Sequence, residues 1–140
     1  MVNKIGIIGC GWLGLPLAES LVNGGFEVRG TTTSKNKMAV LEEKGIQPFQ
    51  ISISEKEING DIHAFLSSIE VLIINIPPKL RGKGPKESYI DKIKLLYLAI
   101  KKSEVKNIIF ASSTAVYGDA KGIVTEETKP LPTTASGIQL

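Results

Sequence analysis

The sequence predicts one α/β domain, in which helices cover both faces of a parallel sheet. Short apolar runs rich in β-branched residues alternate along the chain with amphipathic helical patterns. This alternation is typical of β-α-β units joined by right-handed crossovers. A glycine-rich stretch, Gly9 to Gly14, directly follows the first apolar run. The 140 residues, of which 42% are hydrophobic, are enough to form one core.

The first β-α unit has the clearest pattern. An apolar strand is predicted over residues 4–8, and Leu13, Leu17 and Leu21 then mark the apolar stripe of a helix that ends at Gly24. The remaining elements are predicted in this order: a strand over 26–31, a polar helix over 35–44, a weaker strand over 47–53, a short helix over 61–68 with Asp61 as its cap, a strand over 71–76, a long helix with Ile90, Ile93, Tyr97 and Ile100 on its core face, and a strand over 108–112.

Composition argues against several classes of partner. The net charge of +3 is small and scattered, so it does not indicate nucleic-acid binding. The N-terminal apolar run is too short and too rich in glycine for a membrane span, and no cleavage site follows it. A single cysteine, Cys10, fits a reducing compartment. We therefore expect a cytoplasmic protein with no nucleic-acid or membrane partner.

The glycine-rich stretch reads G-x-G-x-x-G, a motif that is weak evidence when it stands alone. Here it lies between a predicted strand and a predicted helix, where glycines allow a tight turn, close approach to a pyrophosphate and close helix-sheet packing. This context favours a Rossmann-type, doubly wound sheet of three α/β/α layers over a glycine-rich turn without a ligand. We expect the cofactor to contact Gly9, Cys10, Gly11, Trp12, Leu13 and Gly14. Within this loop we interpret Cys10 as a packing residue, and Trp12 as packing against or covering the cofactor.

The end of the second strand bears on the choice between NAD and NADP. An NAD site usually carries an acidic residue about 20 residues after the loop. That position holds Thr32, and Thr33, Ser34 and Lys35 follow it. Hydroxyl groups and a cation suit a 2′-phosphate, which a carboxylate would repel. We therefore favour NADP, with NAD still open; the alternative is that Lys35 and Lys37 only form the solvated start of a helix.

Two other segments are candidate site features. Ile76 and Pro77 end the fourth predicted strand at the carboxyl edge, where open α/β sheets hold ligands. The cationic stretch 79–86 that follows is interpreted as a solvated loop, with closure over a substrate phosphate as the alternative. His63 is the only histidine and has no partner at metal-ligand spacing. We expect no metal site.

The segment after the fifth predicted strand reads S-S-x-x-V-Y-G over residues 112–118. Together with the glycine loop and Pro77-Pro78, it resembles the short-chain dehydrogenase/reductase superfamily, and in particular its extended and atypical NAD(P)-dependent epimerase/dehydratase branch. The resemblance extends to about Pro132. It implies hydride transfer at a hydroxyl or keto carbon of a small molecule, often a nucleotide sugar. It also implies an active-site hydroxyl at Ser113, with Thr114 as the neighbouring candidate.

The chain departs from that family in its Tyr-x-x-x-Lys pair. The alignment puts Ser136 at the tyrosine position and Leu140 at the lysine position. Tyr117 and Lys121 have the right spacing, but Gly118 argues against a helix that would bring them together. We expect a cofactor-binding domain over 1–140 that lacks the substrate-binding C-terminal region and whose sheet stops before a sixth strand. Its open strand edge makes a homodimer possible.

Three functions remain open on these grounds. The first is the NADP-binding domain of an oxidoreductase or epimerase/dehydratase, catalytically incomplete over these 140 residues. The second is a non-catalytic dinucleotide-binding sensor or scaffold. The third is the N-terminal domain of a hydroxyacid dehydrogenase, which the sequence from Gly14 to Ala18 also suits.

Overall fold

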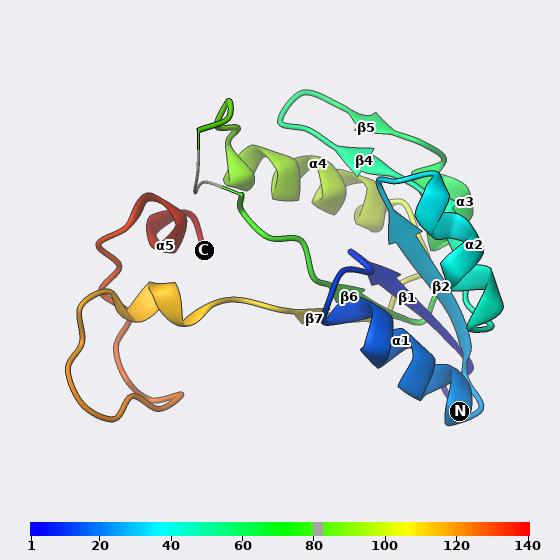
Figure 1. Ribbon diagram of the computed structural model, residues 1–140, viewed down its shortest axis with the longest axis horizontal. Helices are drawn as coiled ribbons and strands as arrows, with labels where there is room; N and C mark the ends of the chain where they lie inside the picture. Colours follow the sequence, from blue (N-terminus) through cyan, green and yellow to red (C-terminus); the bar gives the residue numbers. More distant parts are fainter. Residues whose placement is uncertain (80–82) are drawn as a thin grey trace.

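The computed structural model describes residues 1–79 and 83–140. Its elements in chain order are β1 (Lys4–Ile8), α1 (Gly14–Asn23), β2 (Glu27–Thr32), α2 (Asn36–Glu43), β3 (Gln47–Gln50), β4 (Ser52–Ile53), β5 (Ile58–Asn59), α3 (Ile62–Leu66), β6 (Val71–Ile74), α4 (Tyr89–Lys101), β7 (Asn107–Phe110), the 3-10 helix η1 (Thr114–Tyr117) and α5 (Ala135–Gln139). Five parallel strands form one sheet in the order β3-β2-β1-β6-β7 (Figure 1). This arrangement confirms the predicted Rossmann-type fold.

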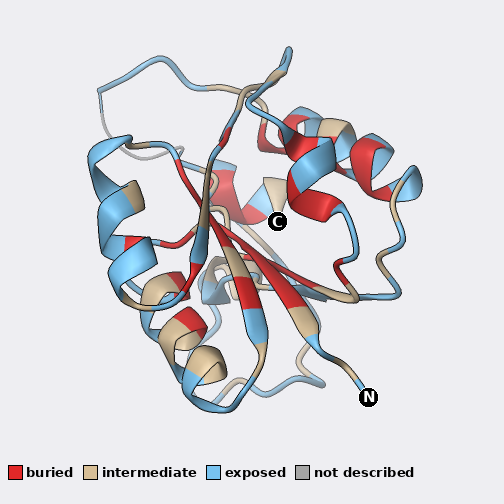
Figure 2. Ribbon diagram, turned by 90° about the vertical axis from the view of Figure 1, so that its right-hand side faces the viewer, coloured by how far each residue is buried: buried red, intermediate tan, exposed pale blue. Residues whose placement is uncertain are grey.

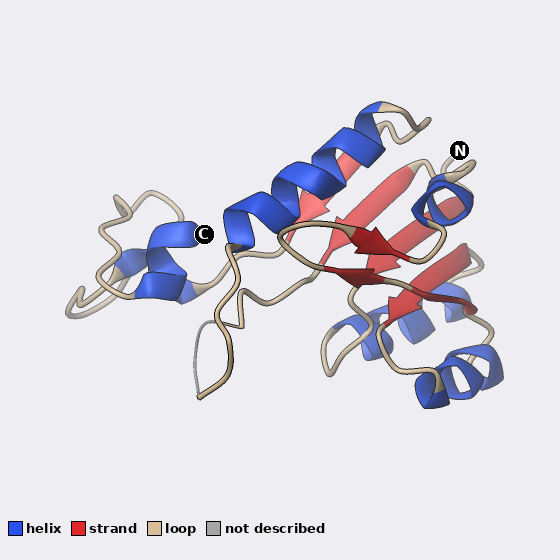
Figure 3. Ribbon diagram, turned by 90° about the horizontal axis from the view of Figure 1, so that it is seen from above, coloured by secondary structure: helices blue, strands red, loops and turns tan. Residues whose placement is uncertain are grey.

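Two apolar cores separate the three layers, and Figure 3 shows helices on both faces of the sheet. On one face, Ile7 and Val28 of the sheet pack with Ala18 of α1 and Leu41 of α2. On the other face, Ile8 and Leu72 of the sheet pack with Phe65 of α3 and Leu96 of α4. Buried residues therefore follow the central strands and the inner sides of the helices (Figure 2). Strands apolar on both faces are typical of a parallel sheet covered on both sides.

Arg29 of β2 forms hydrogen bonds that link the sheet to the end of α3. Its Nη1 atom lies 2.8 Å from the carbonyl oxygen of Ala64, 3.1 Å from that of Phe65 and 2.6 Å from that of Ser67. Its Nε atom donates to Oε1 of Gln47 at 3.0 Å. The guanidinium therefore satisfies carbonyl groups at the end of α3 that have no partner within the helix.

The predicted strand over 47–53 is two strands in the structure. β3 ends at Gln50, and the N–H of Ile51 still donates to the carbonyl of Thr32 at 3.1 Å. The chain then leaves the sheet, and β4 pairs with β5 as an antiparallel hairpin. The chain changes direction at Ile51, which lies between β3 and β4 and is 4% exposed. β5 lies in a charged segment without an apolar alternation, which is why the sequence did not predict the hairpin.

The predicted core face of α4 is wrong in part. Ile100 is buried and Ile93 is half-buried against the core, but Ile90 is 43% exposed and Tyr97 is 54% exposed. The buried side is instead formed by Tyr89, Lys92, Leu96, Ala99 and Ile100. α4 has two apolar stripes, and the rest of the described chain covers only one of them. Periodicity cannot distinguish two such stripes on one helix.

Residues after β7 extend away from the sheet and fold back on themselves (Figure 1). Here α5 begins after Thr134, whose Oγ1 accepts a hydrogen bond from the N–H of Gly137 at 3.1 Å. A side chain at Gly137 would overlap the carbonyl oxygen of Ala115 in η1, so the two helices are in direct contact. Among the helices of the described residues, none is both long enough and apolar enough to cross a bilayer.

Candidate functional site

The glycine loop joins β1 to α1 at the carboxyl edge of the sheet. Gly9 has φ +97°, and a side chain there would overlap the carbonyl oxygen of Asn75. A side chain at Gly14 would overlap the carbonyl oxygen of Gly9, so α1 starts as close to the loop as a glycine allows. Gly11 differs from both, because no heavy atom beyond its chain neighbours lies within 4 Å of where its Cβ would be. Gly11 therefore presents open backbone surface.

The start of α1 leaves its N–H groups available to a ligand. Leu13 occupies the cap position and provides no side-chain cap, and the first turn carries no acidic residue. Within residues 1–79 and 83–140, the N–H groups of Gly11, Trp12 and Leu13 have no hydrogen-bond acceptor. These donors and the positive end of the helix dipole create a positive local potential, which is the environment that an anion favours. Trp12 lies beside it, 89% exposed.

The end of β2 holds the loop through a residue that the sequence analysis did not identify. Thr31 is buried, and its Oγ1 accepts from the N–H of Gly9 at 3.0 Å. Its carbonyl oxygen accepts from the N–H of Cys10, also at 3.0 Å. The only signal available in the sequence was a threonine at the carboxyl end of the predicted strand 26–31. Thr31 fixes the first two residues of the loop.

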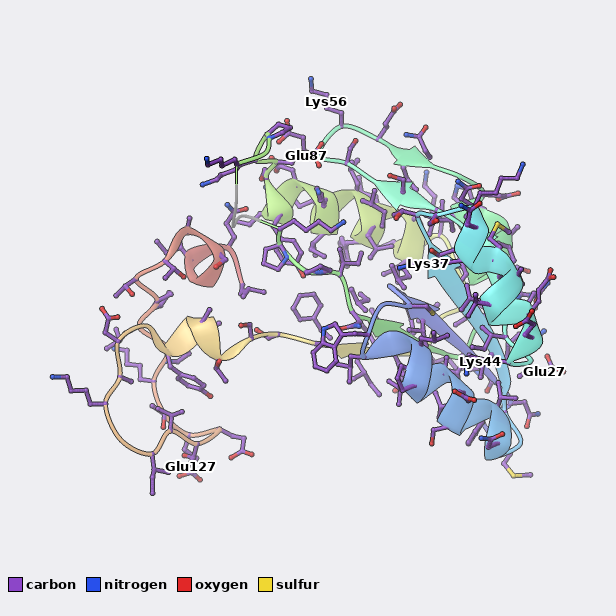
Figure 4. The ribbon with its side chains drawn as sticks, in the orientation of Figure 1. Glu27, Lys37, Lys44, Lys56, Glu87 and Glu127 are labelled. Atoms are coloured by element: carbon purple, nitrogen blue, oxygen red, sulfur yellow. The ribbon has the colours of Figure 1, made fainter. Side chains whose placement is uncertain are left out.

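The predicted ribose-side residues divide into buried and exposed ones. Thr32 is 8% exposed, and its Oγ1 accepts from the N–H of Ser34 at 3.2 Å, so this hydroxyl shapes the turn into α2. Thr33 and Lys35 are exposed, and Ser34 is half-buried. Thr33 and Lys35 are therefore the side chains that this turn offers to a ligand. Lys37, the second residue of α2, is also exposed and is labelled in Figure 4.

Asn75, directly after β6, also forms hydrogen bonds that hold the loop. Asn75 donates from Nδ2 to the carbonyl oxygen of Gly9 at 3.2 Å, and its backbone N–H donates to that of Ile8 at 2.8 Å. The sequence analysis treated residues 71–76 as a uniform apolar strand. Asn75 carries the only side-chain amide in that run, and this was the signal in the sequence for the contact.

Ile76 and Pro77 follow Asn75 at the same edge of the sheet. The carbonyl oxygen of Ile76 accepts from the hydroxyl of Tyr89 at 2.9 Å, and Pro77 is exposed. Burial raises the pKa of Tyr89 to about 12, so this hydroxyl remains a donor at neutral pH. Tyr89 thus holds the end of β6 in place. The cationic stretch that follows includes residues 80–82, which lie outside the described residues.

The hydroxyl cluster lies at the end of β7, the neighbour of β6. Ser113 is exposed and caps η1, with its Oγ accepting from the N–H of Ala115 at 3.2 Å. A hydroxyl that accepts one hydrogen bond can still donate its proton to a ligand. Thr114 is exposed beside it, whereas Ser136 is 8% exposed and lies in α5, 3.4 Å from the Oγ1 of Thr134.

Tyr117 is engaged within the C-terminal segment. It ends η1, and its hydroxyl donates to the carbonyl oxygen of Thr125 at 3.0 Å. Gly118 has φ +57°, and no helix includes residues 118–134. Tyr117 and Lys121 therefore do not share a helical face.

Two further candidates contribute no chemistry to this edge. Cys10 is buried, and its burial raises the pKa of the thiol to about 11, so the thiol stays protonated at neutral pH. His63 is an exposed residue of α3. Among the described residues, no three His, Cys, Asp or Glu side chains gather as metal ligands do.

The sheet order brings the glycine loop, Thr33, Ile76 and Ser113 to one carboxyl edge, with the loop at the point between β1 and β6 where the strand order reverses. This position and the loop geometry define a Rossmann-type dinucleotide-binding domain. Residues 4–129 match the family of the NAD binding domain of 6-phosphogluconate dehydrogenase, and the chain belongs to this family.

Known proteins extend this comparison. Protein YeeZ of Escherichia coli strain K12 is 34% identical over 138 residues, which are 97% of this chain and 50% of YeeZ. The structure of MoeE5 in complex with UDP-glucose and NAD has a TM-score of 0.77 at 22% identity, over 98% of this chain and 45% of MoeE5. UDP-glucuronic acid 4-epimerase from Bacillus cereus, in complex with NAD, has a TM-score of 0.74 at 24% identity, over 97% of this chain and 48% of the epimerase. The chain thus spans about half the length of YeeZ. The structures of MoeE5 and of the epimerase share the fold of this chain.

Proposed function

We propose that this chain is the NADP-binding domain of an oxidoreductase or epimerase/dehydratase of the atypical short-chain type. The observation that carries this proposal is the open backbone at Gly11 beside the N–H groups of Trp12 and Leu13, which have no acceptor among the described residues. The pyrophosphate would accept hydrogen bonds from these groups. The nicotinamide would supply or accept a hydride at a hydroxyl or keto carbon of a small-molecule substrate of the nucleotide-sugar class. Ser113 would donate a hydrogen bond to the substrate oxygen.

The preference for NADP is supported by the turn after β2. No carboxylate stands at its end, and the exposed side chains Thr33 and Lys35 supply a hydroxyl and a cation. These groups would bind a 2′-phosphate by charge-assisted hydrogen bonds. NAD would lack that contact, so it is the second choice of cofactor.

We expect NADPH to bind about tenfold more tightly than NADH, a difference of about 1.4 kcal/mol. Lys35→Glu should reverse this preference, because its carboxylate repels the 2′-phosphate and accepts from a ribose hydroxyl. Trp12 is the only tryptophan and lies in the loop, so its fluorescence reports binding of either nucleotide.

Lys56→Glu is the control for this titration. It makes the same change in charge on an exposed residue in the turn between β4 and β5, and should leave the preference unchanged (Figure 4). Equal affinity for both nucleotides in the native protein and in Lys35→Glu would reject the NADP preference. Absence of binding to either nucleotide would reject the proposed function.

A non-catalytic sensor or scaffold is the second candidate. It is favoured by Ser136 and Leu140, which the resemblance to the short-chain dehydrogenases aligns with the tyrosine and lysine of that superfamily. Membership of the 6-phosphogluconate dehydrogenase domain family also agrees with a hydroxyacid dehydrogenase. The S-S-x-x-V-Y-G segment favours the epimerase/dehydratase type over that third option.

Ser113→Ala distinguishes an enzyme from a sensor. In the full-length protein, assayed with NADPH and keto or nucleotide-sugar substrates, we expect it to lower turnover by about 100-fold. Its affinity for NADPH should not change. Ser112→Ala, at the adjacent exposed hydroxyl, is the matched control and should retain activity. Ser113→Ala with unaltered turnover, or no turnover by the native protein, would favour the sensor.

A further inference from the structure

The chain leaves the sheet after β6 through residues 76–79, a segment with few hydrogen bonds of its own. Pro77 and Pro78 have no N–H to donate. Among the described residues, the only hydrogen bond to the backbone of this segment comes from the hydroxyl of Tyr89, which donates to the carbonyl oxygen of Ile76 at 2.9 Å. This bond therefore anchors the segment at the point where it leaves the sheet.

Tyr89 donates this bond from a fixed position. It is the first residue of α4 and is 1% exposed. Its neighbour Ser88 caps the helix through its side chain, and the N–H of Ser88 donates to Oε2 of Glu55, in the turn between β4 and β5, at 2.8 Å. Nζ of Lys92 lies 2.6 Å from Oε2 of Glu87, which Figure 4 labels just before α4. The start of α4 is thus held by a cap, by the β4-β5 hairpin and by an ion pair.

An anchor on the carbonyl of Ile76 also fixes the ring of Pro77. The carbonyl group of Ile76 and the nitrogen of Pro77 belong to one planar peptide unit. The pyrrolidine ring includes that nitrogen, so the ring turns with the peptide plane. Pro77 is exposed, and Asn75, two residues earlier, donates to the carbonyl oxygen of Gly9 in the glycine loop. The ring of Pro77 is therefore presented in one orientation at the carboxyl edge.

We propose that Tyr89 is a positioning residue for the nicotinamide half of the cofactor. Its hydroxyl holds the ring of Pro77 in the orientation in which the ring packs against the nicotinamide riboside. The adenosine half lies at the end of β2, which β1 separates from β6, so Tyr89 does not influence it. This inference rests on the proposed function, because it requires a dinucleotide that extends along the carboxyl edge.

Tyr89→Phe tests the proposal, because it removes the hydroxyl and keeps the buried ring. Calorimetric titration compares NADPH with 2′-phospho-ADP-ribose, which has the same pyrophosphate and both riboses but no nicotinamide. We expect Tyr89→Phe to weaken the binding of NADPH about fivefold, the net contribution of one hydrogen bond. Its affinity for 2′-phospho-ADP-ribose should change by less than about twofold. A residue that only stabilised the fold would affect both ligands alike.

Tyr97→Phe is the matched control. Tyr97 lies on the same helix and is 54% exposed, and its hydroxyl has no hydrogen-bond partner among the described residues. We expect this variant to bind both ligands as the native protein does.

Pro77→Ala tests the route from Tyr89 to the cofactor. It should weaken NADPH binding by a similar factor, and the double variant Tyr89→Phe/Pro77→Ala should bind NADPH no more weakly than Pro77→Ala alone, because the two residues act through one contact. Pro77→Ala also decides the matter if Tyr89→Phe does not fold, since native affinity for NADPH in this variant would overturn the proposal.

Three results with Tyr89→Phe would also overturn it: unchanged affinity for NADPH, an equal loss for both ligands, or effects that add to those of Pro77→Ala. In each case the native protein still binds NADPH, so the proposed function stands. Failure of the native protein to bind either ligand would reject the proposed function, and this inference with it.

Discussion

Gly11→Val is expected to abolish dinucleotide binding without changing the free energy of unfolding. Its side chain would project into the space that the pyrophosphate needs, where the folded protein places no atom within 4 Å. We expect at least a 100-fold loss of affinity for NADPH, or about 2.7 kcal/mol. Titration by Trp12 fluorescence measures the affinity, and thermal unfolding without ligand measures stability.

Gly14→Val is the matched control in the same loop. Its Cβ would overlap the carbonyl oxygen of Gly9, so α1 would have to move away from the sheet. We expect this variant to lose roughly 3 kcal/mol of stability as well as binding. If Gly11→Val binds NADPH as the native protein does, the phosphates do not lie on this backbone.

Arg29→Met is expected to cost about 2 to 3 kcal/mol of folding free energy. It removes the donors to the carbonyl groups at the end of α3 and the bond to Gln47, while it keeps an apolar stem of similar length. Hydrogen bonds from a charged donor are each worth about 1.5 to 3 kcal/mol, but solvent reaches some of these acceptors and reduces the sum. Thermal or urea unfolding measures the loss.

Arg29→Lys separates charge from geometry. An ammonium group keeps the charge but cannot reach α3 and Gln47 at once as the planar guanidinium does, so we expect it to recover less than half of the loss. Gln47→Ala removes only the Nε partner and should cost no more than about 1 kcal/mol. Equal stability of the native protein and Arg29→Met would show that solvent replaces these contacts.

The order of strands and helices was predictable because it depends on local periodicity. The glycine loop was predictable because its spacing and its position between a strand and a helix are both local. The contacts that fix the loop were not, since Thr31 and Asn75 reach Gly9 from 22 and 66 residues away in sequence. Only the strand order, with β1 between β2 and β6, brings them together.

The core face of α4 shows a different limit. Ile90, Ile93, Tyr97 and Ile100 repeat at helical spacing as a buried stripe does, yet only Ile93 and Ile100 pack against the core. Whether a stripe is buried depends on what polypeptide covers it, which the helix's own sequence does not encode. The β4-β5 hairpin was missed for a related reason, because its short strands have no alternating pattern.

The bonds from Thr31 and Asn75 to Gly9 have a consequence for the thermodynamics of binding. They hold the loop in its turn without a ligand, so the conformational entropy of this segment is lost during folding. Preorganisation of this kind lowers the entropic cost of association. Binding should therefore proceed without a slow ordering step, and saturating cofactor should raise the melting temperature by mass action rather than by restructuring the loop.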